Sequence, residues 1–290
     1  MSKLDTGPYK GVRDFYPEDM AIQNYIFDTW RKVSKDAGYE EYSASILEPA
    51  ELYRSKTSEE IVSEQTFAFT DRGGREVVLR PEMTPTLARM VAGRRRDLKF
   101  PLRWFSIPNV FRYERPQRGR RREHWQLNCD LLGISGVEAE VEIITLANSI
   151  MKAFGAKNED FSIRISSRKA LPEGTDMDVI RKIDKGEDVG IDIQETEEIQ
   201  KIISMLSEAG IDNAVFDPKI VRGFDYYTGV VFEVFDTDAE NNRSLFGGGR
   251  YDNLLEVFGV EPVPTVGFGM GDITLRDFLE THKLGPYSSR

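Results

Sequence analysis

The stretch FRYERPQRGRRREHWQLNCD, residues Phe111–Asp130, decides the fold. A loop rich in arginine separates two segments of strand-like composition, which indicates two antiparallel strands joined by a long connection. Successive side chains of a strand point to opposite faces. On the second strand the apolar face carries Trp125, Leu127, Cys129 and Leu131, and the polar face carries Gln126, Asn128 and Asp130. We therefore predict that one face packs on the core and the other borders a wet site beneath the arginine loop.

This loop concentrates positive charge in an acidic protein. The 290 residues include 39 Lys and Arg against 49 Asp and Glu, a formal net charge of −10. Six arginines fall within the loop and its flanks: Arg112, Arg115, Arg118, Arg120, Arg121 and Arg122. An acidic protein binds polyanions through a local basic patch, and guanidinium offers phosphate a rigid fork of donors that keeps its charge. The loop is thus a candidate phosphate site, whereas for Arg94–Arg96 a solvated surface is the favoured interpretation.

Several classes of protein are excluded by what the sequence lacks. No apolar run approaches the roughly 18 residues of a membrane span, and the N-terminal residues have no apolar signal-peptide core. One cysteine, Cys129, and two distant histidines, His124 and His282, argue against a disulfide and a metal site. The P-loop, GxSxG and dinucleotide fingerprints are absent. We expect a cytoplasmic protein without a membrane segment or metal ligands.

Outside the loop, helices and strand pairs follow one another in a way typical of an α+β protein. Predicted helices begin at Pro17, Thr84, Val137 and Asp272. Strand pairs joined by turns, rather than βαβ units, favour a mainly antiparallel sheet with helices packed on it. The charged residues 167–213 are predicted to form a small inserted helical unit between residues 1–166 and 214–290.

The segment LRPEMTP, Leu79–Pro85, is a second candidate for a polar site. Strand alternation would place Glu82 and Thr84 on one side, where a carboxylate and a hydroxyl could bind an ammonium group. The alternative is a strand end running into a capped helix. That alternative explains Thr84 and Pro85 but not Glu82.

Two later segments are also more polar or more glycine-rich than a core strand requires. VRGFDYYTG, Val221–Gly229, combines an arginine with Tyr226 and Tyr227, of which strand alternation would let only one face a ligand. In GGGRYD, Gly247–Asp252, three glycines allow the backbone to approach a ligand closely. The alternative there is a strand that ends at a flexible turn.

Together these segments resemble the histidyl-tRNA synthetases, a family of class II aminoacyl-tRNA synthetases. The resemblance extends over nearly the whole chain and rests on GVRDFYPED, LRPEMTPTLAR, FRYERPQRGRRREHWQLNCDLLG, VRGFDYYTGVVFE, GGGRYDNLL and VGFGMGD, in this order. It implies the class II catalytic fold, an antiparallel sheet of six to seven strands flanked by helices. Phe111–Asp130 corresponds to motif 2, two strands and a loop over ATP. The Trp30 helix and the ILEPAEL segment resemble motif 1, the dimer-forming element, so a homodimer is implied.

The resemblance also implies a reaction, in which ATP with Mg²⁺ activates histidine and the product is transferred to the acceptor end of tRNA(His). For ATP the implied residues are Arg112 and Arg222 on the α-phosphate, Glu114 near the adenine amino group, Arg120 and Arg122 at the γ-phosphate or the tRNA end, and Gly271. For histidine they are Glu82, Thr84 and Gln126 at the ammonium group, Asp130 and Tyr227 at the imidazole, and Arg222 and Tyr226.

Three features depart from the commonest family pattern. Thr274 occupies the place of the motif 3 arginine, as in the archaeal and plant-organelle type, and Arg276 lies two residues on. Asp130 replaces the more usual glutamate, which shortens the reach to the imidazole. The sequence ends at Arg290, soon after motif 3, so the anticodon-binding domain expected by analogy is absent.

Two other functions are weighed against this one. The regulatory subunit of ATP phosphoribosyltransferase shares the fold, lacks the anticodon domain and binds histidine without activating it, but the intact motif 2 and Arg222 argue against it. An unrelated nucleic-acid-binding module would bind RNA in a salt-sensitive way without any dependence on histidine. His124 borders the loop and could act as a base, although a packing role is favoured.

Overall fold

The computed structural model describes residues 4–54, 65–172, 174–184, 187, 189–191, 193–220, 226–241 and 243–288. Its helices are α1 (Pro17–Asp36), α2 (Ala50–Arg54), α4 (Thr84–Gly93), α5 (Glu138–Ala153), α6 (Met177–Asp184), α7 (Glu197–Glu208) and α8 (Asp272–Thr281), with the 3-10 turns η1 (Arg168–Ala170), η2 (Leu254–Phe258) and η3 (Gly285–Tyr287). Its strands are β1 (Glu40–Glu41), β2 (Leu47–Pro49), β3 (Phe67–Thr70), β4 (Glu76–Leu79), β5 (Leu102–Ser106), β6 (Asn109–Phe111), β7 (Glu123–Leu132), β8 (Phe161–Ser167), β9 (Ala214–Phe216), β10 (Val230–Asp236), β11 (Ser244–Arg250) and β12 (Thr265–Gly271). Arg222 lies outside the described residues, with its neighbours in 221–225.

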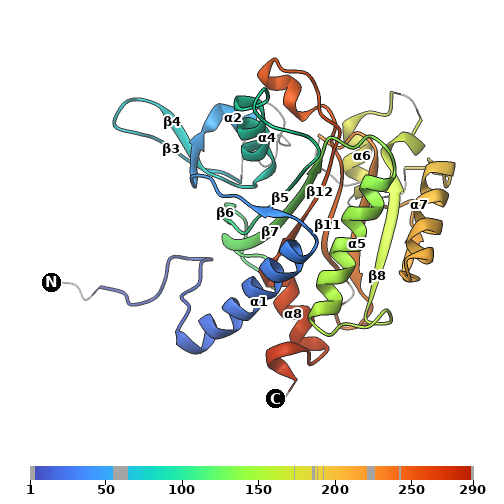
Figure 1. The fold of residues 1–290 in the computed structure, drawn as a ribbon. Helices are drawn as coiled ribbons and strands as arrows, with labels where there is room; N and C mark the ends of the chain where they lie inside the picture. The colour runs from blue at the N-terminus through green and yellow to red at the C-terminus, as the bar shows by residue number, and fades with distance from the viewer. Residues whose placement is uncertain are drawn as a thin grey trace.

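Most strands of the described residues form one large sheet with the order β1-β5-β7-β12-β11-β10-β8-β9, and β6 pairs with β7 outside that path (Figure 1). The strands β2, β4 and β3 form a second, three-stranded sheet. The strands from β5 to β8 along this order are all antiparallel, which confirms the prediction of a mainly antiparallel sheet. The two short edge strands instead run parallel to their neighbours. Parallel pairing needs a crossover, and at the β8–β9 edge the connection contains α6 and α7.

The central strand β7 has the two faces that the alternation in its sequence predicts. Leu127, Cys129 and Leu131 are fully buried in the main core. Asn128 and Asp130 point to the opposite face and line a cavity. The packing therefore confirms which side of this strand is core and which is site.

The main core lies between one face of the sheet and a layer of long helices. Buried residues of α1, α5, α7 and α8 belong to one cluster with the strands, among them Trp30, Ile143, Ile202 and Phe278. Figure 1 shows α1 and α8 close together at the end of α5, while the β3–β4 hairpin projects to the other side. The opposite face is covered by a second cluster, in which α4 packs against η2 through residues such as Leu87 and Leu254. No helix in the described part of the chain is long and apolar enough to cross a membrane.

Residues 103–114, whose composition is typical of one long strand, are broken in two. Both β5 and β6 pair with β7, but Ile107 and Pro108 separate them. Proline has no backbone N–H to give to a ladder, so it interrupts a strand in this position. The carbonyl of Pro108 still accepts a hydrogen bond from the Gln126 backbone N–H at 3.0 Å, which holds the two halves against β7.

The predicted helical insertion divides into two parts that pack differently. Leu171, Ile180, Ile183 and Ile193 form a small cluster of their own. By contrast, α7 buries Ile199, Ile202 and Leu206 in the main core. α7 therefore packs with the helices that cover the main sheet.

Candidate active site

Two adjoining cavities open on the polar face of the sheet. The first is lined by Glu82, Thr84, Arg112, Gln126, Asn128, Asp130, Tyr226, Tyr227, Gly247, Tyr251, Gly267, Phe268 and Gly269. The second is lined by Arg112, Glu114, Gly119, Arg120, Arg121, His124, Gln126, Leu245, Gly269, Gly271, Ile273 and Thr274. Arg112, Gln126 and Gly269 line both, so the cavities meet at a guanidinium group.

Glu82 supplies a buried carboxylate to the first cavity. It stands between the end of β4 and the start of α4 and is 4% exposed. The hydroxyl of Tyr226 donates a hydrogen bond to its Oε2 at 3.0 Å, across 144 residues of sequence. A buried carboxylate fixed in this way is suited to bind a cation, because burial strengthens the charge interaction.

Arg80 has a different function from Glu82, although the two are close in sequence. Its guanidinium donates to the carbonyl oxygens of Asn109 at 3.0 Å and Ala44 at 2.8 Å. It lines neither cavity and instead ties the end of β4 to neighbouring segments. The strand-end interpretation therefore applies to Arg80, while Glu82 and Thr84 face the site.

Gln126 lies where the two cavities meet and has an unused acceptor. Its Oε1 is buried and has no hydrogen-bond partner among the described residues. The backbone of Gly269 lies so close that a Cβ atom there would overlap the amide of Gln126. A buried acceptor without a partner is costly, so a ligand N–H at this point would be favoured.

Asp130 supplies a second buried carboxyl group to the first cavity. It is 3% exposed and accepts a hydrogen bond from the hydroxyl of Tyr251. Burial raises the pKa of Asp130 to about 7, and the hydrogen bond from Tyr251 opposes that rise. Burial also raises the pKa of Tyr251 well above its usual value, with Asp130 as the next cause. The pair can therefore accept or donate a hydrogen bond near neutral pH, which suits an imidazole ring.

Tyr226 and Tyr227 both line the first cavity. The expectation that only one of them could face a ligand was wrong. Both residues precede β10, which begins at Val230, so strand alternation does not govern them. Their ring centroids are 5.0 Å apart, and each also packs against the ring of Tyr251.

The two cavities differ in charge. The first contains the carboxyl groups of Glu82 and Asp130 beside Arg112. The second contains Arg112, Arg120 and Arg121 with the single carboxylate of Glu114, whose Oε2 lies 4.0 Å from Arg120 Nε. Arg112 is positioned by donating from Nε to the carbonyl of Pro81 at 2.9 Å. A cationic group is favoured in the first cavity and an anion such as phosphate in the second.

His124 lines the second cavity beside these arginines. Burial, together with the positive charges of Arg112 and Arg13, lowers the pKa of His124 to about 3. The ring is therefore neutral at physiological pH. A base with so low a pKa is poorly matched to proton abstraction at pH 7, which supports leaving His124 outside the set of catalytic candidates.

Arg122 is the predicted loop residue that the structure does not bring to either cavity. It is 8% exposed, its Nε donates to the Glu114 carbonyl at 3.1 Å and its Nη1 to the Tyr9 hydroxyl at 3.0 Å. Its guanidinium also stacks over Tyr113 at 3.9 Å. These contacts hold the base of the loop against the N-terminal segment.

Arg276 is likewise turned away from the site. It donates to the Tyr287 hydroxyl at 2.8 Å and to Asp19 at 3.2 Å, on the side of α8 that faces α1 and η3. Gly271, the last residue of β12, does line the second cavity, as does Thr274 one turn into α8.

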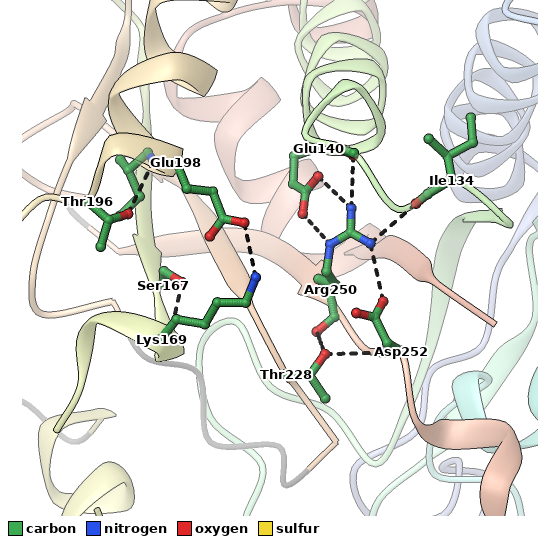
Figure 2. A network of polar contacts seen from close by, with 11 residues as sticks. Ile134, Glu140, Ser167, Lys169, Thr196, Glu198, Thr228, Arg250 and Asp252 are labelled. Carbon is green, nitrogen blue, oxygen red and sulfur yellow. Dashed lines mark hydrogen bonds and ion pairs between the residues drawn. The ribbon is translucent and has the colours of Figure 1, made fainter. Parts of the chain in front are cut away.

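The GGGRYD segment combines a site wall with a structural anchor. Gly247 to Arg250 are the last residues of β11, which ends at a turn as the alternative interpretation expects, and Gly247 also lines the first cavity. Figure 2 shows the Arg250 guanidinium directed at Glu140 of α5, with N–O distances of 2.6 and 2.7 Å. Further bonds reach Asp252 at 3.2 Å and the Ile134 carbonyl at 3.3 Å. The arginine thus fixes β11 to the helical layer, while the next residue, Tyr251, reaches Asp130.

Sequence reasoning missed some residues of the site. Asn128 and Arg121 line the cavities, and their positions on the polar strand face and in the loop could have indicated them. Tyr251 had no such signal, because its contact with Asp130 joins residues 121 positions apart. The described residues contain no group of three or more His, Cys, Asp or Glu side chains that could hold a metal ion.

Comparison with known proteins gives a consistent family. A model of the histidyl-tRNA synthetase family matches residues 11–173 and 175–272. A histidine–tRNA ligase of Leptospira biflexa is 44% identical over 98% of this chain and 76% of its own length. The chloroplastic/mitochondrial histidine–tRNA ligase of Arabidopsis thaliana is 37% identical over 98% of this chain and 68% of its own length.

A solved structure from Bacillus halodurans, described as an ATP phosphoribosyltransferase regulatory subunit/histidyl-tRNA synthetase, superimposes with a TM-score of 0.80 at 25% identity. The superposition covers 96% of this chain and 84% of the Bacillus halodurans chain. The sequence relatives are considerably more similar and carry the ligase name, so the regulatory alternative is not favoured.

Proposed function

The chain belongs to the histidyl-tRNA synthetase family, and from that premise we infer how its two cavities divide the work of charging tRNA. The protein is a histidine–tRNA ligase, which activates histidine with ATP and transfers it to tRNA(His). We propose that the first cavity binds histidine and the second binds ATP. The division of charge carries this proposal: carboxyl groups line the first cavity, arginines line the second, and Arg112 stands between them.

In the first step, a carboxylate oxygen of histidine attacks the α-phosphorus of ATP in line and pyrophosphate leaves. Arg112, with Arg222, holds the negative charge that builds on the α-phosphate oxygens. Glu82, Thr84 and the free acceptor of Gln126 bind the ammonium group of histidine. Asp130 and Tyr227 bind the imidazole, with Tyr226 fixing Glu82 and Tyr251 fixing Asp130.

In the second step, a hydroxyl of the terminal ribose of tRNA attacks the carbonyl carbon of the adenylate, and AMP leaves. We propose that Arg120 of the loop faces the γ-phosphate or the acceptor end. The same role is predicted for Arg122 by resemblance, although its present contacts are with Tyr9 and Glu114. Glu114 is proposed to select the adenine amino group, and Gly271 to leave room for ATP.

Mg²⁺ is proposed as a companion of ATP rather than a resident ion. It keeps several waters and usually binds through substrate phosphates with one or two carboxylates. The second cavity offers one carboxylate, Glu114, among several arginines, which fits an ion carried in on the phosphates. Bound there, it would neutralise charge on the phosphate oxygens.

We further propose a homodimer formed through α1 and residues 46–52, on their likeness to motif 1. A cytoplasmic location is proposed because the substrates of tRNA charging meet there. As for domains, we propose that the inserted unit is restricted to the part around residues 171–193, which has its own apolar cluster.

Histidine-dependent ATP–pyrophosphate exchange tests the activation step. Exchange with histidine and none of the other amino acids is expected. Arg222→Ala should abolish exchange while calorimetry still detects histidine binding, because the arginine acts on the phosphate. Equal loss of both would overturn that assignment. Histidine binding by the unaltered chain without exchange would instead support the regulatory alternative.

A further inference from the structure

Arg243 is a cation beside the second cavity, close to Gly119 and Thr274 that line it, and the sequence motifs did not indicate it. It directly precedes β11 and lies two residues before Leu245, which lines the cavity. Because Arg243 lies outside the strand, its direction is given by its contacts rather than by strand alternation.

The guanidinium of Arg243 lies against the turn of the arginine loop. Gly119 has φ +77°, and a Cβ atom there would overlap Arg243 Nη1 and come within 3.9 Å of Thr274 Cγ2. Gly119 and Thr274 both line the second cavity. The positive charge of Arg243 therefore lies beside Thr274, whose own side chain carries no charge. Arg276, by contrast, points away from the second cavity.

Arg243 shares its acidic partner with the loop. Its Nη1 lies 3.7 Å from Asp277 Oδ2, and Arg118 Nε lies 3.7 Å from the same oxygen. That oxygen is buried and has no hydrogen-bond partner among the described residues. Two guanidinium groups facing one carboxylate leave a surplus positive charge, and neither has the short bidentate geometry that makes such pairs strong.

We propose that Arg243 binds the terminal phosphate of ATP, closing the outer end of the second cavity together with the arginine loop. This rests on the assignment of that cavity to ATP. The two arginines face only one oxygen of Asp277, at a distance longer than a hydrogen bond. A phosphate group has several acceptor oxygens, so it can accept hydrogen bonds from more of the N–H donors of Arg243. The alternative is a surface ion pair of small energetic value that only shapes the loop.

Calorimetry with ATP and with AMP distinguishes phosphate binding by Arg243 from a surface ion pair, because AMP lacks the terminal phosphates. Arg243→Met should weaken ATP binding about 10- to 100-fold, the size expected for a lost charge-assisted hydrogen bond, and AMP binding by less than about threefold. Retained AMP binding also shows that the variant is folded. Arg243→Lys, which keeps the charge without the fork, should fall between wild type and Arg243→Met.

Two further variants serve as controls. Arg164→Met removes a part-buried arginine of β8 whose Nη1 lies 3.2 Å from Asp217. Arg164 lines neither cavity, so this variant should leave the ratio of ATP to AMP affinity unchanged. Asp277→Asn should bind ATP at least as tightly as wild type, because the competing carboxylate has lost its charge. If Asp277→Asn reproduces the loss seen in Arg243→Met, or if Arg243→Met weakens ATP and AMP equally or neither, the proposal is wrong. Absence of histidine-dependent exchange in the wild type would be a failure of the proposed function instead.

Discussion

Replacing Asp130 by asparagine should change how the stability of this protein depends on pH. The carboxyl group is 3% exposed, and burial raises its pKa from 3.8 to about 7. In the unfolded chain the same group titrates near its ordinary value of about 3.9. Between these two pKa values the folded state holds one more proton than the unfolded state.

The sign and size of the effect follow from that proton. The contribution of Asp130 to the free energy of unfolding is fully present below about pH 4 and is lost as pH rises toward about 7. Each pH unit in this window costs about 1.4 kcal/mol, which gives a total of about 4 kcal/mol. Asparagine cannot ionise, so Asp130→Asn lacks this dependence.

Urea unfolding of both proteins without substrates, from about pH 4.5 to pH 8, measures the difference directly. The stability of wild type relative to Asp130→Asn should fall by about 3 kcal/mol across this range, because other titrating groups cancel in the comparison. In Tyr251→Phe the upper limit of this pH range should move higher, because the hydrogen bond that the variant loses stabilises the ionised form of Asp130. A difference that stays constant within about 0.5 kcal/mol, or that grows with pH, would refute the reasoning.

Three other predictions concern the site and its support. Glu82→Gln should raise KM for histidine about 10- to 100-fold in pyrophosphate exchange and leave KM for ATP within about threefold, because the lost charge faces only the first cavity; a parallel rise in both constants would contradict its role. His124→Gln should show the opposite pH effect to Asp130→Asn, because the pKa of His124 is lowered to about 3. The contribution of His124 to the free energy of unfolding is present above about pH 6.5 and is lost as pH falls, and urea unfolding of both proteins at pH 4.5 and pH 7 would detect this loss. Arg250→Met should lower the free energy of unfolding by about 3–5 kcal/mol, because the charged Glu140 would stay buried without its partner. The double variant Arg250→Met/Glu140→Leu should recover much of this loss, and no recovery would mean that the broken ion pair is not its cause.

Much of the site was already encoded locally. On β7, alternation alone assigned Gln126 and Asp130 to the wet face, because a strand fixes the side of each residue whatever its partners are. The proline and threonine at the start of α4 are a local signal of the same kind, and they place the start of the helix to within one residue, although Met83 rather than Thr84 is the N-cap. The charge of the arginine loop, set against a net charge of −10, indicated an anion site before any contact was known.

Where local rules gave way, the long-range packing decided. Tyr226 and Tyr227 both line the first cavity because they lie outside the strands, where side chains need not alternate between two faces. Arg122 instead contacts Tyr9, although it belongs to the same basic run as Arg120. Likewise, Pro108 splits a segment whose composition resembled one strand.

The sequence by itself determined the sheet-and-helix architecture, the core side of β7 and the chemical types of group available to the site. Only the tertiary structure decided which of these groups meet. Tyr251 contacts Asp130, 121 residues away in sequence, and Arg243 lies against Gly119 beside the second cavity. The pairing of β7, β12 and β11 brings these segments together. The physical reason is that backbone pattern fixes the direction of a side chain within its own element, whereas its partner depends on how separate elements are brought into register by burial of the shared core.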